Sequence, residues 1–363
     1  MTTEIELART NPSIDDWGQV RAALVERDAR LVLEGGRAIA SLAESETFAA
    51  VLTQVADVLT RIGSSTRRLF WRDSKGGLPL AADVLGLELL ELIDRQSHAL
   101  ANKLKWGNFH PCASVFWEHL SRRDIAPIWQ EGPFVEPKRA QGAVDGLNGL
   151  VAEMRHEMGL TPFKTSLRAH AHRTKKAFKE LKDYLLFVAD TQPGVSCHPL
   201  ELSYSQHYPC DPEYRNKAFR LAHRHIEQTV NLAFRNYGRA IAGHAWSISE
   251  SSTCGLQVHL LILLSKVTVF ERIPLLHDVA QIWMEVTDFG GVCIDFLSEG
   301  TGCFTYRAPE SLPAPEHHIE EMILRQAFFM TAPNLLVSVN QPRGYKLLSM
   351  GRLRQPQQPQ APG

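Results

Sequence analysis

The sequence predicts an α+β fold in which a split β-α-β-β-α-β antiparallel sheet follows an all-helical N-terminal addition. An apolar run at Leu256–Leu264 and a strand-like run at Ile241–Ser249 follow one another, separated by a short polar turn. Segments with helical periodicity flank this pair, and they also fill the first 135 residues. Apolar positions that repeat every two residues indicate strands, and those that repeat every three or four indicate helices.

The composition is that of a soluble globular protein, with 44% apolar and 22% charged residues in a chain of 363. The formal net charge of −1 gives no global field that would attract a nucleic acid or an acidic membrane, so such a partner would need a local patch. The start of the chain lacks the pattern of a signal peptide, and the longest apolar run is far too short to cross a membrane. We therefore expect a cytoplasmic protein without a membrane partner.

Residues 1–135 are predicted to form a helical accessory domain. Ser45–Gly63 carries the stripe of an amphipathic helix, and Val115–Trp129 is rich in Trp and Phe, which favours core packing or contact with a protein partner. The Pro- and Gly-containing stretch Gly132–Gly142 marks the predicted boundary. A second domain is then expected over residues 136–352, and the low-complexity tail at 353–363 is expected to be disordered.

The predicted helix Lys164–Leu186 is the one distinctly basic element of the chain. A charged helix face is commonly only a solvated surface, and the functional interpretation is a face that contacts phosphates. The candidate nucleic-acid-binding residues are Lys164, Arg168, Arg173, Lys175, Lys176, Lys179 and Lys182.

The remaining periodicities give the order of the sheet. The predicted elements are the strand Cys197–Ser205, the helix Glu213–Tyr237, the strands Ile241–Ser249 and Leu256–Leu264, a helix that starts at Pro274, the strand Val292–Leu297 and a closing helix Glu316–Met330.

Two polar side chains interrupt the apolar central strand. Gln257 and His259 are two residues apart, so they project from the same face of the strand, roughly 7 Å from each other. A histidine in such a place can be a core residue with satisfied hydrogen bonds, or the pair can be a set of metal ligands.

Six short runs narrow the choice, because their order resembles that of a known family. They are LELSYSQHY (Leu200–Tyr208), GHAWSISE (Gly243–Glu250), GLQVHLLILL (Gly255–Leu264), IWMEVTDFGG (Ile282–Gly291), ILRQAFFMT (Ile323–Thr331) and RGYKLLSMG (Arg343–Gly351). The series resembles the replication initiators of filamentous phages and related prophages, the inovirus gene-two-product type, which belong to the HUH superfamily of rolling-circle endonucleases. The resemblance covers roughly residues 146–351 and leaves the N-terminal helices unassigned.

The resemblance implies a divalent metal held by a His-hydrophobic-His pair, an acidic residue on the preceding strand, and a tyrosine on a later helix that attacks the scissile phosphate of single-stranded DNA. This chain departs at each position. The first histidine is Gln257, the acidic position is Ser249 with Glu250 one place later, and the tyrosine is Phe329, which has no hydroxyl to act as a nucleophile. Gln257, His259 and Glu250 are the candidate ligands of a weakly held Mg²⁺ or Mn²⁺ ion, and no other cofactor is expected.

Three functions stay open from the sequence. The first, which the departures favour, is a protein that binds single-stranded or hairpin DNA on a degenerate initiator scaffold without nicking it. The second is an active metal-dependent endonuclease with a displaced nucleophile such as Tyr345. The third is a protein-interaction module in which the N-terminal helices contact a partner.

Overall fold

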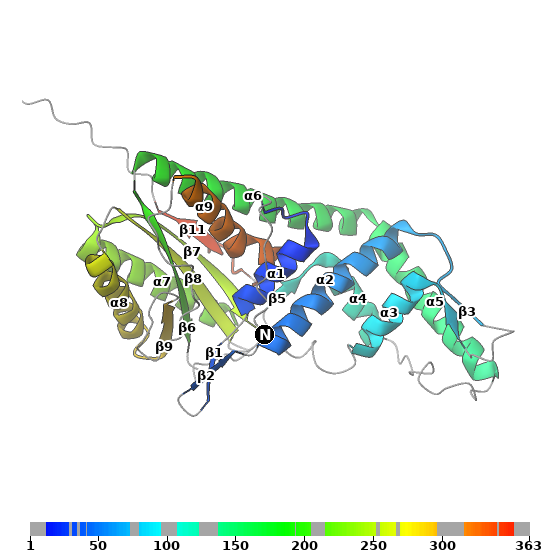
Figure 1. Ribbon diagram of the computed structural model, residues 1–363. Helices are drawn as coiled ribbons and strands as arrows, with labels where there is room; N and C mark the ends of the chain where they lie inside the picture. The colour runs from blue at the N-terminus through cyan, green and yellow to red at the C-terminus, as the bar shows by residue number, and fades with distance from the viewer. Residues whose placement is uncertain are drawn as a thin grey trace, which may run out of the picture.

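The computed structural model describes residues 12–28, 31–34, 37–40, 42–72, 80–95, 107–122, 137–192, 194–204, 215–251, 255–265, 269–295, 316–339 and 341–351. Helices and antiparallel sheets both occur, which confirms the predicted α+β class (Figure 1). The disordered tail predicted at 353–363 lies outside the described residues. Within the described ranges, no helix is long and apolar enough to cross a membrane.

The main sheet has five strands in the spatial order β11-β7-β8-β6-β9, and all neighbours are antiparallel. Along the chain, four of these strands alternate with two helices in the order β6-α7-β7-β8-α8-β9. The fifth strand, β11, adds an edge that the periodicity did not predict. The bounds are β6 Ser196–Tyr204, α7 Arg215–Tyr237, β7 Ile241–Ser251, β8 Gly255–Leu264, α8 Val269–Val286, β9 Gly291–Asp295 and β11 Leu348–Met350.

Helices cover both faces of this sheet. On one face, α7 and α8 pack on the even-numbered side chains of the central strands, such as Trp246 and Leu260. On the other face, α6 (Thr161–Thr191) and α9 (Glu316–Thr331) pack on odd-numbered residues, such as Ala245 and Leu261. The alternation follows from the two-residue period of a strand. Because both faces are covered, polar side chains on either one are removed from solvent.

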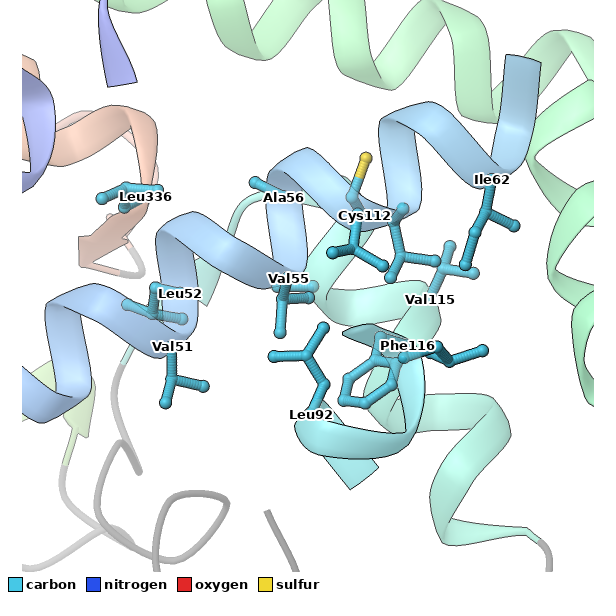
Figure 2. Packing of buried hydrophobic residues seen from close by; sticks show 14 of the residues in the cluster. Val51, Leu52, Val55, Ala56, Ile62, Leu92, Cys112, Val115, Phe116 and Leu336 are labelled. Carbon is cyan, nitrogen blue, oxygen red and sulfur yellow. The ribbon is translucent and has the colours of Figure 1, made fainter. Parts of the chain in front are cut away.

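The N-terminal part has its own hydrophobic core, which extends beyond residue 135. Figure 2 shows Val55 of α2 on the side of Phe116 of α4, and Leu52 of α2 on the side of Leu336, which comes from the C-terminal part of the chain and belongs to the same cluster. The elements are α1 Trp17–Asp28, β1 Leu31–Glu34, β2 Arg37–Ala40, α2 Leu42–Ser64, β3 Phe70–Trp71, β4 Ala81–Ala82, α3 Val84–Arg95, β5 Gly107–Phe109, α4 Pro111–Ser121, α5 Pro137–Gly159, the 3-10 helix Ala332–Leu335 and β10 Val337–Val339.

This part of the chain is not all-helical as expected. Three small two-stranded sheets occur, β1 with β2, β3 with β4, and β5 with β10. The last of these pairs Gly107–Phe109 with Val337–Val339. A strand of two to four residues has too few positions to show an alternating pattern, and a partner more than 200 residues away leaves no local signal.

The helix α6 connects the two parts of the molecule. Its 31 residues span roughly 46 Å, and Figure 1 shows it running along one side from the helical part to the sheet. Phe163 and Phe178 pack against the N-terminal core, whereas Leu181 and Leu185 pack against the sheet. The opposite side of α6 is left for solvent.

Candidate functional site

A cluster of polar side chains lies at one end of the sheet face that α6 and α9 cover. The strand register brings its members together, because Glu201 and Ser247 are both Cα partners of His259, on either side of it. Side chains from three adjacent strands therefore converge, and each is at least 94% buried. The members of this polar cluster are Glu201 and Ser203 of β6, Ser247 and Ser249 of β7, and Gln257 and His259 of β8.

Hydrogen bonds inside the polar cluster satisfy part of it. The side-chain amide of Gln257 donates to the carboxylate of Glu201. A second bond of 2.9 Å joins the hydroxyl of Ser249 to Nε2 of His259. Among the described residues, Oε1 of Gln257 and Oγ of Ser247 have no hydrogen-bond partner. A buried carboxylate needs donors to offset its lost hydration, and Gln257 is one of them.

Phe329 approaches the polar cluster from α9. Its ring meets the imidazole of His259 edge to face, with 5.4 Å between the ring centroids and 84° between the ring planes. The two residues are far apart in the sequence, and only the packing of α9 on the sheet brings them together. The resemblance assigns a metal ligand to one of these positions and the nucleophile to the other. The contact places a phenyl ring, which has no hydroxyl, beside the imidazole of His259.

The carboxylate that meets Gln257 comes from Glu201, which the sequence analysis did not select. Glu201 alternates with apolar residues in β6, a pattern that predicts a solvent-facing side chain, but the burial of both sheet faces places it in the core. Glu250 was the expected acidic ligand. Its Cα pairs with Leu256 in the sheet, and its side chain lies outside the described part of the structure.

The donor set does not fit a metal site. Within the described ranges, no group of three or more His, Cys, Asp or Glu side chains is arranged to hold a metal ion. The NH₂ group of Gln257 donates a hydrogen bond to Glu201, and Nε2 of His259 is hydrogen-bonded to the hydroxyl of Ser249. Divalent metals need several lone pairs directed at one point. Here Nε2 of His259 faces Ser249, and of the two atoms that could bind a metal at Gln257 and His259 only Oε1 of Gln257 is without a hydrogen-bond partner among the described residues. No metal-dependent step follows from this geometry.

The alternative nucleophile Tyr345 lies on the other side of the sheet from His259. Its ring packs edge to face on Phe219 and His223 of α7, with centroid distances of 6.2 and 5.0 Å. Tyr345 belongs to the core of the α7–α8 face, whereas the polar cluster belongs to the α6–α9 face. The sheet itself therefore separates the tyrosine from the histidine.

The basic residues predicted between Lys164 and Lys182 all lie on α6, and they divide into two sets. At 100° per residue, five of them fall within about 60° of one another, on one flank of the helix beside its buried face. Arg173 and Lys176 point to other directions of the same helix. The five residues, called here the basic stripe, are Lys164, Arg168, Lys175, Lys179 and Lys182; the first four are exposed and Lys182 is half-buried.

A cleft of 860 Å³ lies between α4, α5 and α6, and none of the residues that line it belongs to the polar cluster. His119 projects into it, with Nε2 2.7 Å from Glu157 and Nδ1 3.5 Å from Glu153. Because each ring nitrogen faces a different carboxylate, no single ion can bind all three side chains. The arrangement instead fastens α4 to α5.

The chain matches no protein-family model, no curated protein and no solved structure. The resemblance to phage replication initiators therefore rests on the six short runs of the sequence.

Proposed function

We propose that this protein binds nucleic acid on a scaffold derived from an HUH-type replication initiator and does not cut it. The observation that supports this most directly is the contact between Phe329 and His259. The resemblance would explain why the residue at the nucleophile position meets the residue at the metal-ligand position. The contact is present, and Phe329 has no hydroxyl at the position of the family's nucleophile.

Two features oppose cleavage. A phenyl ring cannot attack phosphorus. The carboxylate of Glu201 already accepts a hydrogen bond from the side-chain amide of Gln257. In addition, the side chains of the polar cluster are buried, with exposed fractions from 0% for Gln257 to 6% for Ser203. A phosphodiester could not reach them without displacement of α9.

The binding surface in this proposal is the outer side of α6. Between Lys164 and Lys182 the helix carries seven Lys and Arg residues and a single acidic residue, Glu180. This local excess of positive charge exists in a chain whose net charge is −1, so it is a property of one surface. Local patches of Lys and Arg are the electrostatic requirement for phosphate binding.

The first test combines cleavage and binding on labelled single-stranded, hairpin and duplex DNA, with Mn²⁺, with Mg²⁺ and with a chelator. We expect a retarded complex at low salt, unchanged by the chelator, and neither nicked product nor a covalent protein–DNA adduct. Charge reversal by Arg168→Glu together with Lys179→Glu is expected to weaken binding at least about 10-fold, since each lost phosphate contact costs affinity.

Two results would contradict the proposal. A metal-dependent nick or a covalent adduct would show that a nucleophile survives elsewhere in the chain. Absence of binding to every DNA at low salt, by a protein shown to be folded by circular dichroism, would leave the N-terminal helices and a protein partner as the explanation to pursue.

A further inference from the structure

The basic stripe has a regular geometry. Its residues follow one another at spacings of four, seven, four and three, each close to a whole number of helical turns. From Lys164 to Lys182 the stripe is roughly 27 Å long at 1.5 Å per residue. Both hydrophobic cores hold α6 along its length, and Figure 1 shows its backbone as one continuous straight helix. The five cations therefore follow one another in a row on a rigid support.

The surroundings of this row exclude a membrane surface as its target. A helix that lies on a bilayer inserts an exposed apolar side among the lipids. The apolar side of α6 is used in the interior of the protein, where Leu181, Leu185 and Val188 are at most 5% exposed. A partner of the basic stripe must therefore be a polyanion that binds through its charges and does not need an apolar surface on α6.

The surroundings also disfavour a single strand. Proteins that bind single strands stack the bases on exposed aromatic rings. The aromatic residues of α6 up to Lys182, Phe163 and Phe178, face the hydrophobic cores, and Phe187 lies beyond the end of the row. The polar cluster of the sheet, which could otherwise receive a base, is buried.

We propose that the basic stripe binds the phosphate backbone of double-stranded nucleic acid, including the stem of a hairpin, without reading its sequence. A duplex is a rigid polyanion with one charge per about 1.7 Å of its axis, twice the density of each strand, and it matches a rigid row of cations better than a flexible strand does. This inference rests on the proposed nucleic-acid-binding function and specifies its ligand.

One residue of the row already has an anionic partner. Nζ of Lys175 lies 2.7 Å from Asp15, which precedes α1. Both side chains are exposed, and exposed ion pairs contribute little to stability, so a phosphate can replace Asp15. We therefore count four to five phosphate contacts. The corresponding slope of log K against log salt concentration is about −4, a loss of roughly two orders of magnitude in affinity between 50 and 200 mM salt.

The test is a set of binding titrations with the full chain at several salt concentrations. The ligands are a 20-base-pair DNA duplex of random sequence, an RNA duplex of the same length, and each single strand alone. We expect the duplexes to bind at least about 10-fold more tightly than the strands, with a slope near −4. Arg168→Glu with Lys179→Glu should reduce the slope by about 2, since two contacts are lost. The two duplexes distinguish DNA from RNA as the source of the backbone.

A matched control is available on the opposite side of the sheet. Arg224 and Arg235 are exposed on α7 and are separated by eleven residues, as Arg168 and Lys179 are. Arg224→Glu with Arg235→Glu makes the same change in net charge and is expected to keep the slope of the wild type. If it lowers the slope equally, the binding is a general charge effect and the inference is wrong. Tighter binding of single strands than of duplexes would overturn the inference but leave the proposed function intact, whereas no binding of any ligand would overturn both.

Discussion

The hydrogen bond from Gln257 to Glu201 stabilises a buried carboxylate in the polar cluster. Glu201 is 4% exposed and Gln257 is fully buried, so their partners cannot be replaced by bulk water. A carboxylate in such a place is tolerated only with donors aimed at it. The amide of Gln257 is thus a structural group, and its loss would leave the carboxylate of Glu201 with one donor fewer.

We expect Gln257→Leu to lower the free energy of unfolding by about 2–4 kcal/mol, because the carboxylate of Glu201 loses a buried donor. Urea denaturation monitored by circular dichroism measures the change. Ser247→Ala is the matched control in the same cluster. Its Oγ has no partner among the described residues, so its removal should be neutral or slightly stabilising. Equal destabilisation by both substitutions would show that packing, not hydrogen bonding, sets the energy of this cluster.

At the scale of elements, the packing of α6 on the sheet depends on a close approach between Tyr184 of α6 and Gly243 of β7. A Cβ atom added to Gly243 would lie only 2.7 Å from the hydroxyl oxygen of Tyr184. This hydroxyl accepts a hydrogen bond of 3.1 Å from the backbone N–H of His244. Burial raises the pKa of this phenol, so it stays protonated and can also donate. Glycine at position 243 thus lets the helix approach β7 closely enough for this bond.

Gly243→Ala is expected to destabilise the protein by about 1–3 kcal/mol, since the new methyl group meets the Tyr184 hydroxyl. In a Tyr184→Phe background the hydroxyl is absent, and the same substitution should cost less. Thermal or urea unfolding of the two single variants and the double variant gives the coupling energy. Strictly additive effects would mean that α6 does not make this close contact with β7.

The elements of the sheet show how much local sequence can reveal. The strands β6, β7 and β8 lie within two residues of their predicted bounds, because apolar runs and apolar alternation are both local properties of the sequence. The helix α8 begins at Val269, five residues before Pro274, where a start was predicted. The φ angle of proline also suits positions after the first turn of a helix. Proline is more common at a helix start than elsewhere in a helix, but it does not fix the start. The strand β11 has three residues and gave no periodic signal.

At the scale of the whole molecule, a pair of buried histidines joins the N-terminal helices to the rest of the chain. His110 precedes α4, and its ring packs edge to face on Trp17 of α1 and on His170 of α6. Nε2 of His170 lies 2.8 Å from the carbonyl oxygen of Leu335. Burial lowers the pKa of His110 to about 3, with a further decrease from His170, and burial also lowers the pKa of His170. Both residues are therefore neutral in the folded protein at neutral pH.

Acid should weaken this junction. The pKa of His110 is about 3 in the folded state and about 6.5 when unfolded, so the unfolded chain binds more protons between these values and stability falls as the pH falls. From pH 7 to pH 5 the loss is about 2 kcal/mol for this residue. His110→Asn keeps an acceptor for the N–H of Cys112 but does not titrate, so it should flatten the pH dependence by that amount.

Urea midpoints at pH 7 and pH 5 measure this difference. His277→Asn removes an exposed imidazole of α8 and is expected to retain the pH dependence of the wild type. If His110→Asn also retains it, the loss of stability in acid must originate elsewhere, with His170 and His244 as the next residues to substitute. Burial lowers the pKa of His244 to about 4, so it acts in the same direction.

The sequence by itself determined what depends on local periodicity. A period of two places Gln257 and His259 on one face of β8, and a period of 3.6 collects five cations on one side of α6. The absence of a hydroxyl at Phe329 also follows from the sequence alone. None of these statements requires knowledge of which segments meet in space.

Tertiary structure decided which groups meet. The register between strands places Glu201 and Ser247 beside His259, and the packing of α9 brings Phe329 onto the same imidazole. Packing on the opposite sheet face keeps Tyr345 away from it. These contacts join residues far apart in the chain, and their energy comes from burial and complementary shape, which no short window of sequence contains. The chemistry of the polar cluster is therefore set by long-range packing, although its residues are simple to find one at a time.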